Sequence, residues 1–155
     1  MSFSPEMWIV SGMVLALLLI IVGLLIARYR RLGAPGIFED MEGHEFECYC
    51  ADLLKKRGFI DVEVTKGSGD YGVDILAEKD GVTYAIQCKR YASPVGVKAV
   101  QEAYAGRDYY DRMVGAVLTN QYFTTPAVEA AKKLKILLWD GGYLESMMEE
   151  LSQER

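Results

Sequence analysis

The chain has 155 residues, 51% of them hydrophobic, and its 17 Lys and Arg against 22 Asp and Glu give a net charge of −5. This length allows one modest domain and one additional segment. The acidic balance argues against a protein that binds nucleic acid through its net charge, so any such contact must come from a local basic patch.

An uncharged, apolar segment runs from Trp8 to Ala27. About 20 apolar residues span the hydrocarbon core of a bilayer, so the segment predicts a transmembrane helix. A cleaved signal peptide is the alternative. However, the residues before the apolar run carry only Glu6 and no Lys or Arg, and no small-x-small cleavage site precedes the arginines that follow. The pattern therefore favours a retained helix.

Three arginines follow the apolar segment directly: Arg28, Arg30 and Arg31. Basic residues beside a span stay in the cytoplasm, which predicts a single-pass protein of the cell membrane with its N-terminus outside. The glycines and the proline of the next segment are typical of a linker. The predicted division of the chain is an outer tail at 1–7, a transmembrane helix at 8–27, a juxtamembrane linker at 28–42 and a cytoplasmic domain at 43–155.

The cysteines Cys48, Cys50 and Cys88 are an odd number in a domain expected to face a reducing compartment. No disulfide framework is implied. A zinc site would need further ligands at suitable spacing, and His44 is the only histidine. We interpret the three cysteines as structural.

Helices and strands are expected to alternate beyond the linker, because the spacing of apolar residues changes repeatedly from a helical to a strand period. In chain order we expect a helix at 43–58, a strand at 60–66, a hairpin at 72–91, a helix at 97–110, a strand at 113–119, a helix at 125–134, a strand at 136–139 and a helix at 143–151. This order predicts an α/β fold in which an antiparallel hairpin joins parallel strands through right-handed crossovers. The helix at 97–110 is expected to bury Val97, Val100, Ala103 and Tyr104.

The hairpin at 72–91 turns at Asp80-Gly81, a strong two-residue turn signal. With that turn, Lys79 pairs with Val82 and Asp74 lies opposite Gln87. Lys89 follows two residues later on the same face. The other face is expected to be core and carries Val73, Ile75, Ala77, Tyr84, Ile86 and Cys88.

Asp74, Gln87 and Lys89 together have the chemistry of a metal site for phosphate reactions. Carboxylate and amide oxygens suit a small, hard cation such as Mg²⁺. The lysine can orient or deprotonate a water, or neutralise charge that builds on a phosphate. The alternative is the ordinary solvated face of a hairpin.

The hairpin and its flanks resemble the Mrr-type restriction endonuclease family, a branch of the PD-(D/E)xK nuclease superfamily. The resemblance runs from about Gly43 to Leu151 and rests on four motifs: Phe46-Glu47, Asp70-Tyr71-Gly72, Gly72-Val73-Asp74 and Gln87-Cys88-Lys89-Arg90-Tyr91. It implies a restriction-endonuclease-like three-layer α/β core, with a mixed β-sheet flanked by helices. Gln87 departs from the acidic residue usual in the superfamily; glutamine is common there in the Mrr branch, but it removes one negative charge from the site.

The resemblance implies a catalytic set of Asp74, Gln87, Lys89 and Glu47. Of these, Asp74, Gln87 and Glu47 would hold Mg²⁺, with Mn²⁺ as a possible substitute, and Lys89 would position the nucleophile or offset charge on the phosphate. Glu47 also borders the apolar stripe of its predicted helix, so a boundary glutamate with its carboxylate in water is the alternative.

Candidate DNA contacts surround this set: Lys66, Ser68, Asp70, Arg90, Lys98 and Gln101. Ordinary surface charge is the alternative for the basic ones. The segment Gly67 to Gly72 fits G-x-G-x-x-G, but it leads into a strand and does not open a helix, so it does not predict a dinucleotide site. Its backbone N–H groups can instead approach a DNA phosphate.

The sequence thus predicts a membrane-anchored, metal-dependent DNA endonuclease of restriction or DNA-processing type. A membrane-tethered DNA-binding module that has lost turnover on the same fold is the alternative, and a membrane interaction domain unrelated to DNA is a third. The expected partners are DNA, a membrane through the N-terminal helix, and a second copy in a possible homodimer.

Overall fold

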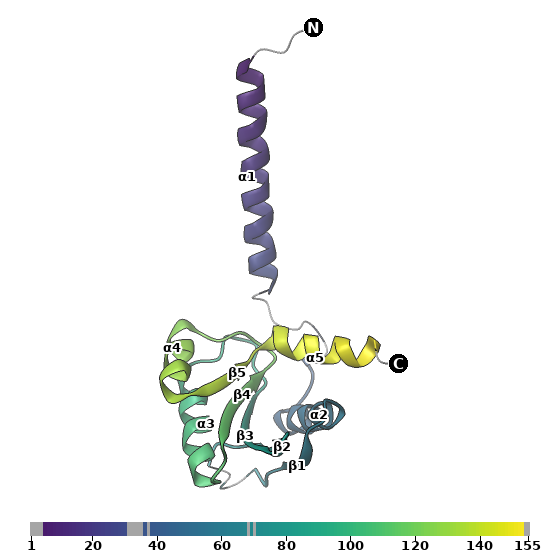
Figure 1. Cartoon of the computed structure of the whole chain (residues 1–155), viewed down its shortest axis with the longest axis vertical. Coiled ribbons are helices and arrows are strands. Elements are labelled where there is room, and N and C mark those ends of the chain that lie inside the picture. Colours follow the sequence, from purple (N-terminus) through teal and green to yellow (C-terminus); the bar gives the residue numbers. More distant parts are fainter. Residues whose placement is uncertain (1–4, 31–35, 37, 68, 70, 154–155) are drawn as a thin grey trace. The chain divides into compact units, whose positions relative to one another are not determined.

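The computed structural model describes residues 5–30, 36, 38–67, 69 and 71–153 (Figure 1). The chain forms two compact units, Met1–Leu32 and Gly33–Arg155.

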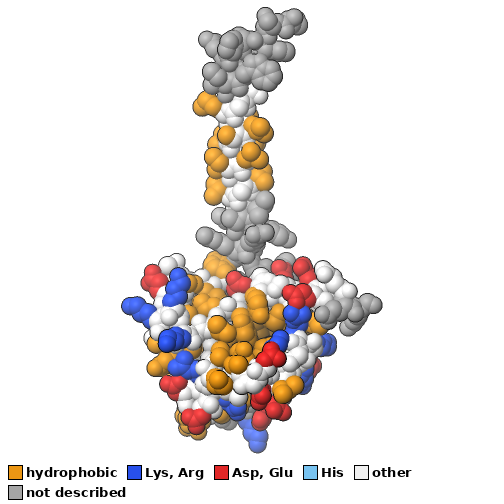
Figure 2. Space-filling view, viewed as in Figure 1, with side chains coloured by type: hydrophobic (Ala, Val, Ile, Leu, Met, Phe, Trp, Pro, Cys, Tyr) orange, Lys and Arg blue, Asp and Glu red, His pale blue; other side chains and the backbone are white. Residues whose placement is uncertain are grey.

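The first unit contains a single helix, α1 (Pro5–Arg30). The helical part of the prediction for 8–27 is therefore confirmed. Side chains are described for 11–25, where every residue is exposed, and hydrophobic groups lie on both flanks of the helix in view (Figure 2). Among the described residues, no helix has both the length and the apolarity needed to cross a membrane, so the transmembrane part of the prediction is not confirmed.

The second unit is a five-stranded sheet with helices on both faces (Figure 1). Its elements are α2 (Gly43–Lys56), β1 (Ile60–Val64), β2 (Ile75–Lys79), β3 (Val82–Lys89), α3 (Val97–Tyr109), β4 (Val114–Thr119), α4 (Thr125–Leu134), β5 (Ile136–Trp139) and α5 (Gly141–Gln153). The strands lie in the order β1-β2-β3-β4-β5. β1, β2 and β3 are antiparallel, whereas β3, β4 and β5 are parallel, which confirms the predicted mixed α/β sheet.

The β2–β3 turn has the predicted geometry. Asp80 and Gly81 have φ values of 52° and 76°, the positive pair that a tight two-residue turn needs. Lys79 pairs with Val82 and Ile75 pairs with Ile86, so the predicted register is confirmed.

The sheet face toward α2 and α5 is packed with large side chains. The buried cluster on this face includes Cys50 and Cys88 together with the large residues Phe38, Phe46, Leu54, Trp139 and Leu144. Phe38 falls in the predicted linker at 28–42, yet it is 1% exposed, and its ring meets that of Phe46 edge-on at 5.3 Å.

The opposite face is also covered, by α3 and α4, so the expectation of core on one face of the hairpin only is wrong. Small residues fill this layer, among them Ala99, Ala103, Ala127 and Ala131. Leu76 and Ala85 of the hairpin also lie on this side and cluster with Val73. The hairpin is therefore an inner part of a three-layer domain, because the crossover helices α3 and α4 cover one face of the sheet while α2 and α5 cover the other.

Two details of the predicted core are corrected. Val73 clusters with Leu76 and Ala85 and not with the α2 layer, because it precedes β2. Val97 and Tyr104 are each 37% exposed, while Ala99 and Gly106 take the inner positions of α3.

Candidate active site

The main chain on both sides of Asp74 is held by neighbouring segments. Asp74 N donates to Ile86 O at 2.9 Å, and Thr65 N donates to Asp74 O at 2.9 Å. Thr65 Oγ1 also donates to Val73 O at 2.6 Å. Asp74 therefore sits between the end of β1 and β3 as an extension of β2, and hydrogen bonds on both sides hold its backbone.

The end of β3 is held in the same way by β4. Thr119 Oγ1 donates to Lys89 O at 2.6 Å. The Tyr91 backbone N donates to Asn120 Oδ1 at 2.9 Å, and Asn120 Nδ2 donates to Tyr91 O at 3.0 Å. Both Thr119 and Asn120 are buried, so these bonds have little competition from water.

The structure brings Asp74 and Gln87 together. Asp74 Oδ2 accepts hydrogen bonds from the Cys88 backbone N at 2.6 Å and from Gln87 Nε2. Both residues are buried, at 7% and 4% exposure. Gln87 Oε1 is buried as well and has no hydrogen-bond partner among the described residues. An acceptor in that position needs a donor or a cation, because a buried polar atom without a partner costs free energy.

Lys89 lies beside this pair and contacts a residue that was not predicted. Its Nζ is 2.8 Å from Glu102 Oε2 on α3. Burial lowers the pKa of Lys89, but the hydrogen bond and charge of Glu102, with smaller contributions from Tyr91 and Asp74, raise it more. The net pKa lies above the usual lysine value, so Lys89 is an ammonium at neutral pH.

One sequence pattern could have indicated Glu102 as a residue of the site. It borders the stripe of small residues, Ala99 and Ala103, that buries α3, in the same way that Glu47 borders the stripe of α2. The adjacent Gln101, the predicted DNA contact on this helix, is exposed.

Glu47 lies on α2, which covers the other face of the sheet, and its hydrogen bond is to His44 on the same helix. Its side chain is 21% exposed, and Oε2 lies 3.1 Å from His44 Nδ1. The hydrogen bond to Cys50, burial, and the charges of Cys50, Asp74 and Glu47 all raise the pKa of the Cys88 thiol. Cys88 thus lies within the electrostatic reach of both carboxylates, which approach it from different elements.

The candidate DNA contacts lie in different environments. Lys66 and Gln101 are exposed, and Lys98 is 87% exposed, with Nζ 3.7 Å from Glu102 Oε1. Arg90 Nη1 donates to Glu39 O at 3.1 Å, so Arg90 holds the segment before α2. Ser68 and Asp70 lie outside the described residues.

The described residues also show which side chains a metal site would need, and where a separate cavity lies. Within the described part of the chain, no group of three or more His, Cys, Asp and Glu could hold a metal ion; a site here would therefore depend on the amide of Gln87. A cavity of about 300 Å³ between α2 and α5 is lined by residues such as Tyr49 and Met148 and includes none of the predicted site.

The sequence of residues 38–148 matches the model of a restriction endonuclease family, the Mrr catalytic domain. The chain belongs to the Mrr-type restriction endonuclease family. The match begins at Phe38, the residue that the structure buries in the α2 layer, and it covers the whole sheet of the Mrr-type domain.

Three solved structures resemble the Mrr-type domain. One is the crystal structure of AF1548, a protein of unknown function, at 28% identity and a TM-score of 0.50, covering 62% of this chain and 54% of that one. The DNA modification-dependent restriction endonuclease AspBHI has 19% identity and a TM-score of 0.52, covering 71% and 31%. MspJI restriction endonuclease, in complex with a 27-mer oligonucleotide, has 21% identity and a TM-score of 0.55, covering 71% and 28%.

The chain spans about half the length of AF1548 and less than a third of AspBHI and MspJI. At this level of identity, the two endonucleases show a shared fold. No curated protein matches the chain.

Proposed function

We propose that the Mrr-type domain is a DNA endonuclease that hydrolyses phosphodiester bonds with a divalent cation, Mg²⁺ or Mn²⁺. The observation that carries the proposal is the contact of Asp74 with Gln87 beside the charged Lys89, in a chain of a restriction endonuclease family. DNA as the substrate class is supported by the family and by the oligonucleotide bound to MspJI.

The donor set fits a hard cation. The Asp74 carboxylate supplies charge, and Gln87 Oε1 is a buried acceptor without a partner among the described residues. These are the oxygen ligands that Mg²⁺ prefers. Glu47 would add a second carboxylate from α2. When bound, such an ion polarises a phosphate and lowers the pKa of a water.

Lys89 would act on the phosphate as a fixed positive charge. Its side chain is 19% exposed, so it borders the solvent while Asp74 and Gln87 lie deeper. A cation held in a partly buried site stabilises developing negative charge better than one in water, because solvent screens it less.

DNA would be held mainly by exposed groups near Lys89. Lys66, Lys98 and Gln101 are accessible, and Ser68 and Asp70 belong to the glycine-rich segment that leads to Asp74. Arg90 would contribute charge while it keeps its bond to Glu39 O.

The decisive experiment compares cleavage of plasmid and linear DNA by the chain with Mg²⁺, with Mn²⁺ and with EDTA. Asp74→Asn and Lys89→Met should each lower the cleavage rate about 10²–10³-fold, the usual cost of removing one charge-stabilising group. Asn keeps an oxygen that can accept the Cys88 N–H, so the fold should persist. Asp52→Asn, an exposed change on α2, is the control. Wild-type activity in either site variant would remove that residue from the chemistry.

A DNA-binding module without turnover is the second candidate. It is favoured by the ion pair between Lys89 and Glu102, which already occupies the ammonium, and by Gln87, which removes one negative charge from the metal site. Salt-sensitive DNA binding with no cleavage under any of the metal conditions would select this function.

We further propose that 8–27 anchors the domain to the cell membrane, with the N-terminus outside and the domain in the cytoplasm. Support comes from the uncharged sequence, from the arginines after it and from the exposed apolar side chains of α1 (Figure 2). Detergent, but not high salt, should release the full chain from a membrane pellet, and release by salt alone would contradict the anchor.

We also propose a homodimer through α1 or α5, in which each copy cuts one strand of the DNA. The molar mass of the chain in detergent solution tests this proposal.

A further inference from the structure

Glu102 connects two lysines at the edge of the site. Its Oε2 lies 2.8 Å from Lys89 Nζ and its Oε1 lies 3.7 Å from Lys98 Nζ. The Lys89 and Glu102 side chains are 19% and 28% exposed, whereas Lys98 is 87% exposed. The first contact is therefore partly shielded from water and strong, while the second is a surface ion pair of small value.

The position of Glu102 is set by a close approach of α3 to the loop before Asp74. A Cβ atom at Gly72 would lie 2.8 Å from Glu102 Cβ and 3.1 Å from Glu102 Cα. Gly72 also has φ of 78°, which glycine adopts without strain. The absence of a side chain at Gly72 lets the α3 backbone sit directly on this loop, so Asp74 and Glu102 are placed by the same contact.

We propose that Glu102 is a positioning residue for Lys89. Glu102 holds the Lys89 ammonium at the end of β3, where the phosphodiester bond of DNA is hydrolysed. This inference rests on the proposed nuclease function. A lysine has many rotamers, and an unpaired one loses that freedom only when substrate arrives. Glu102 selects one orientation in advance and acts on the phosphate through Lys89.

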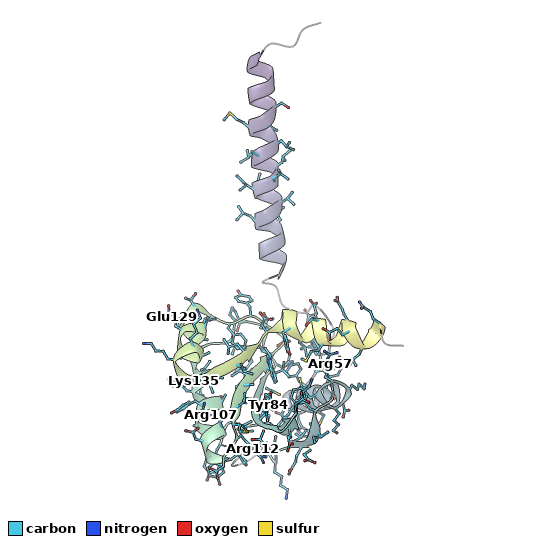
Figure 3. The ribbon with its side chains drawn as sticks, viewed as in Figure 1. Arg57, Tyr84, Arg107, Arg112, Glu129 and Lys135 are labelled. Atoms are coloured by element: carbon cyan, nitrogen blue, oxygen red, sulfur yellow. The ribbon has the colours of Figure 1, made fainter. Side chains whose placement is uncertain are left out.

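The test measures cleavage at saturating DNA and Mg²⁺ by the full chain. Glu102→Ala should lower kcat about 10²-fold, as expected when a catalytic group is displaced by about 1 Å. Glu102→Gln keeps an acceptor oxygen of the same reach, so its kcat should lie between those of Glu102→Ala and the wild type. The KM for DNA and the Mg²⁺ concentration for half-maximal rate should not change. Glu129→Ala, on the exposed surface of α4, is the matched control (Figure 3).

A second variant separates positioning from a general structural role. If Glu102 acts through the ammonium, Lys89→Met/Glu102→Ala should cleave as slowly as Lys89→Met and no slower. A structural defect would act independently of residue 89, so the double variant would show the product of the two single reductions in cleavage rate. That result would overturn the inference.

Three other outcomes would also overturn it: a Glu102→Ala chain with wild-type kcat, one that is faster because the contact masks Lys89, or one whose main change is a higher requirement for Mg²⁺. Failure of the proposed function is recognised separately. A wild-type chain with no metal-dependent cleavage would overturn both proposals, whereas an active wild type with an equally active Glu102→Ala would overturn only this one.

Discussion

The two faces of the sheet are packed differently. Toward α2 and α5 the layer is made of large side chains, such as Phe38, Phe46 and Trp139. Toward α3 and α4 it is made mostly of alanine and valine. Large side chains bury more apolar area, whereas small ones let a helix backbone approach the strands. The face of large residues therefore stabilises the fold, and the face of small residues places α3 against the site.

The glycines show how close this approach is. A Cβ atom at Gly106 would lie 2.2 Å from Val73 Cγ2 and 2.9 Å from Tyr71 O. A Cβ atom at Gly115 would lie 2.7 Å from Ile136 Cδ1 and 3.2 Å from Ala103 O. Arg107 also joins α3 to the end of α4, because its Nη1 donates to Leu134 O at 3.2 Å (Figure 3). A side chain at either glycine would therefore push α3 away from the sheet.

The largest effect on stability is expected for Phe46→Ala on the face of large residues. The side chain is 1% exposed, so its removal should lower the free energy of unfolding by about 3–5 kcal/mol. Urea unfolding measures this loss. The cleavage rate per folded molecule should fall only through Glu47, the neighbour of Phe46 on α2, because α3 is not disturbed. Met113→Ala, at a 66% exposed position, should change stability by no more than about 0.5 kcal/mol and serves as the control.

Gly106→Ala on the face of small residues should have a smaller effect on stability and a larger one on activity. Overpacking costs about 1–3 kcal/mol, but alanine regains about 1 kcal/mol of helix propensity over glycine. Relief of the clash with Val73 moves α3, and with it Glu102, so kcat should fall more than in Phe46→Ala.

Gly142→Ala in α5 is the matched control for this change. Of the atoms that the structure describes, a Cβ atom there meets only Asp140 Oδ1, at 3.4 Å, so both stability and kcat should be kept. If Gly106→Ala retained full activity at reduced stability, the assignment of different roles to the two faces would be contradicted.

The smallest effect is expected from pH at Cys88, which lies on the face of large residues. The hydrogen bond to Cys50, burial and the nearby charges raise the pKa of its thiol. The folded state thus binds this proton more tightly than the unfolded state. The contribution is complete below the unfolded thiol pKa of about 8.5 and is lost as pH rises through the folded value. Tm should fall from neutral to alkaline pH less steeply in Cys88→Ala than in the wild type, and equal slopes would contradict the assignment.

The hairpin shows how much could be predicted from local sequence. Asp80-Gly81 defines the turn, and strict alternation then defines the register, so the meeting of Asp74 with Gln87 followed from counting residues. The combination of an antiparallel hairpin with parallel crossovers also followed, because alternating helices and strands leave few topologies. The family resemblance at 43–151 agrees with the matched range of 38–148.

Glu102 shows where local sequence was not enough. Its helix was predicted within one residue, but its contact with Lys89 depends on how closely α3 lies on the sheet. That distance is set by Gly72, Gly106 and Gly115, which come from three separate segments. The same cause explains the exposure of Val97 and Tyr104, since small residues and not large ones face the strands.

By itself, the sequence determined the order of the elements, the hairpin register and the candidate set of Asp74, Gln87 and Lys89, because each follows from patterns within a few residues along the chain. The tertiary structure alone decided that both faces of the hairpin are covered, that the helix carrying Glu47 covers the face opposite α3, and that Glu102 forms an ion pair with Lys89. These relations join residues far apart in the chain, and they depend on the volumes of the side chains that meet between the layers.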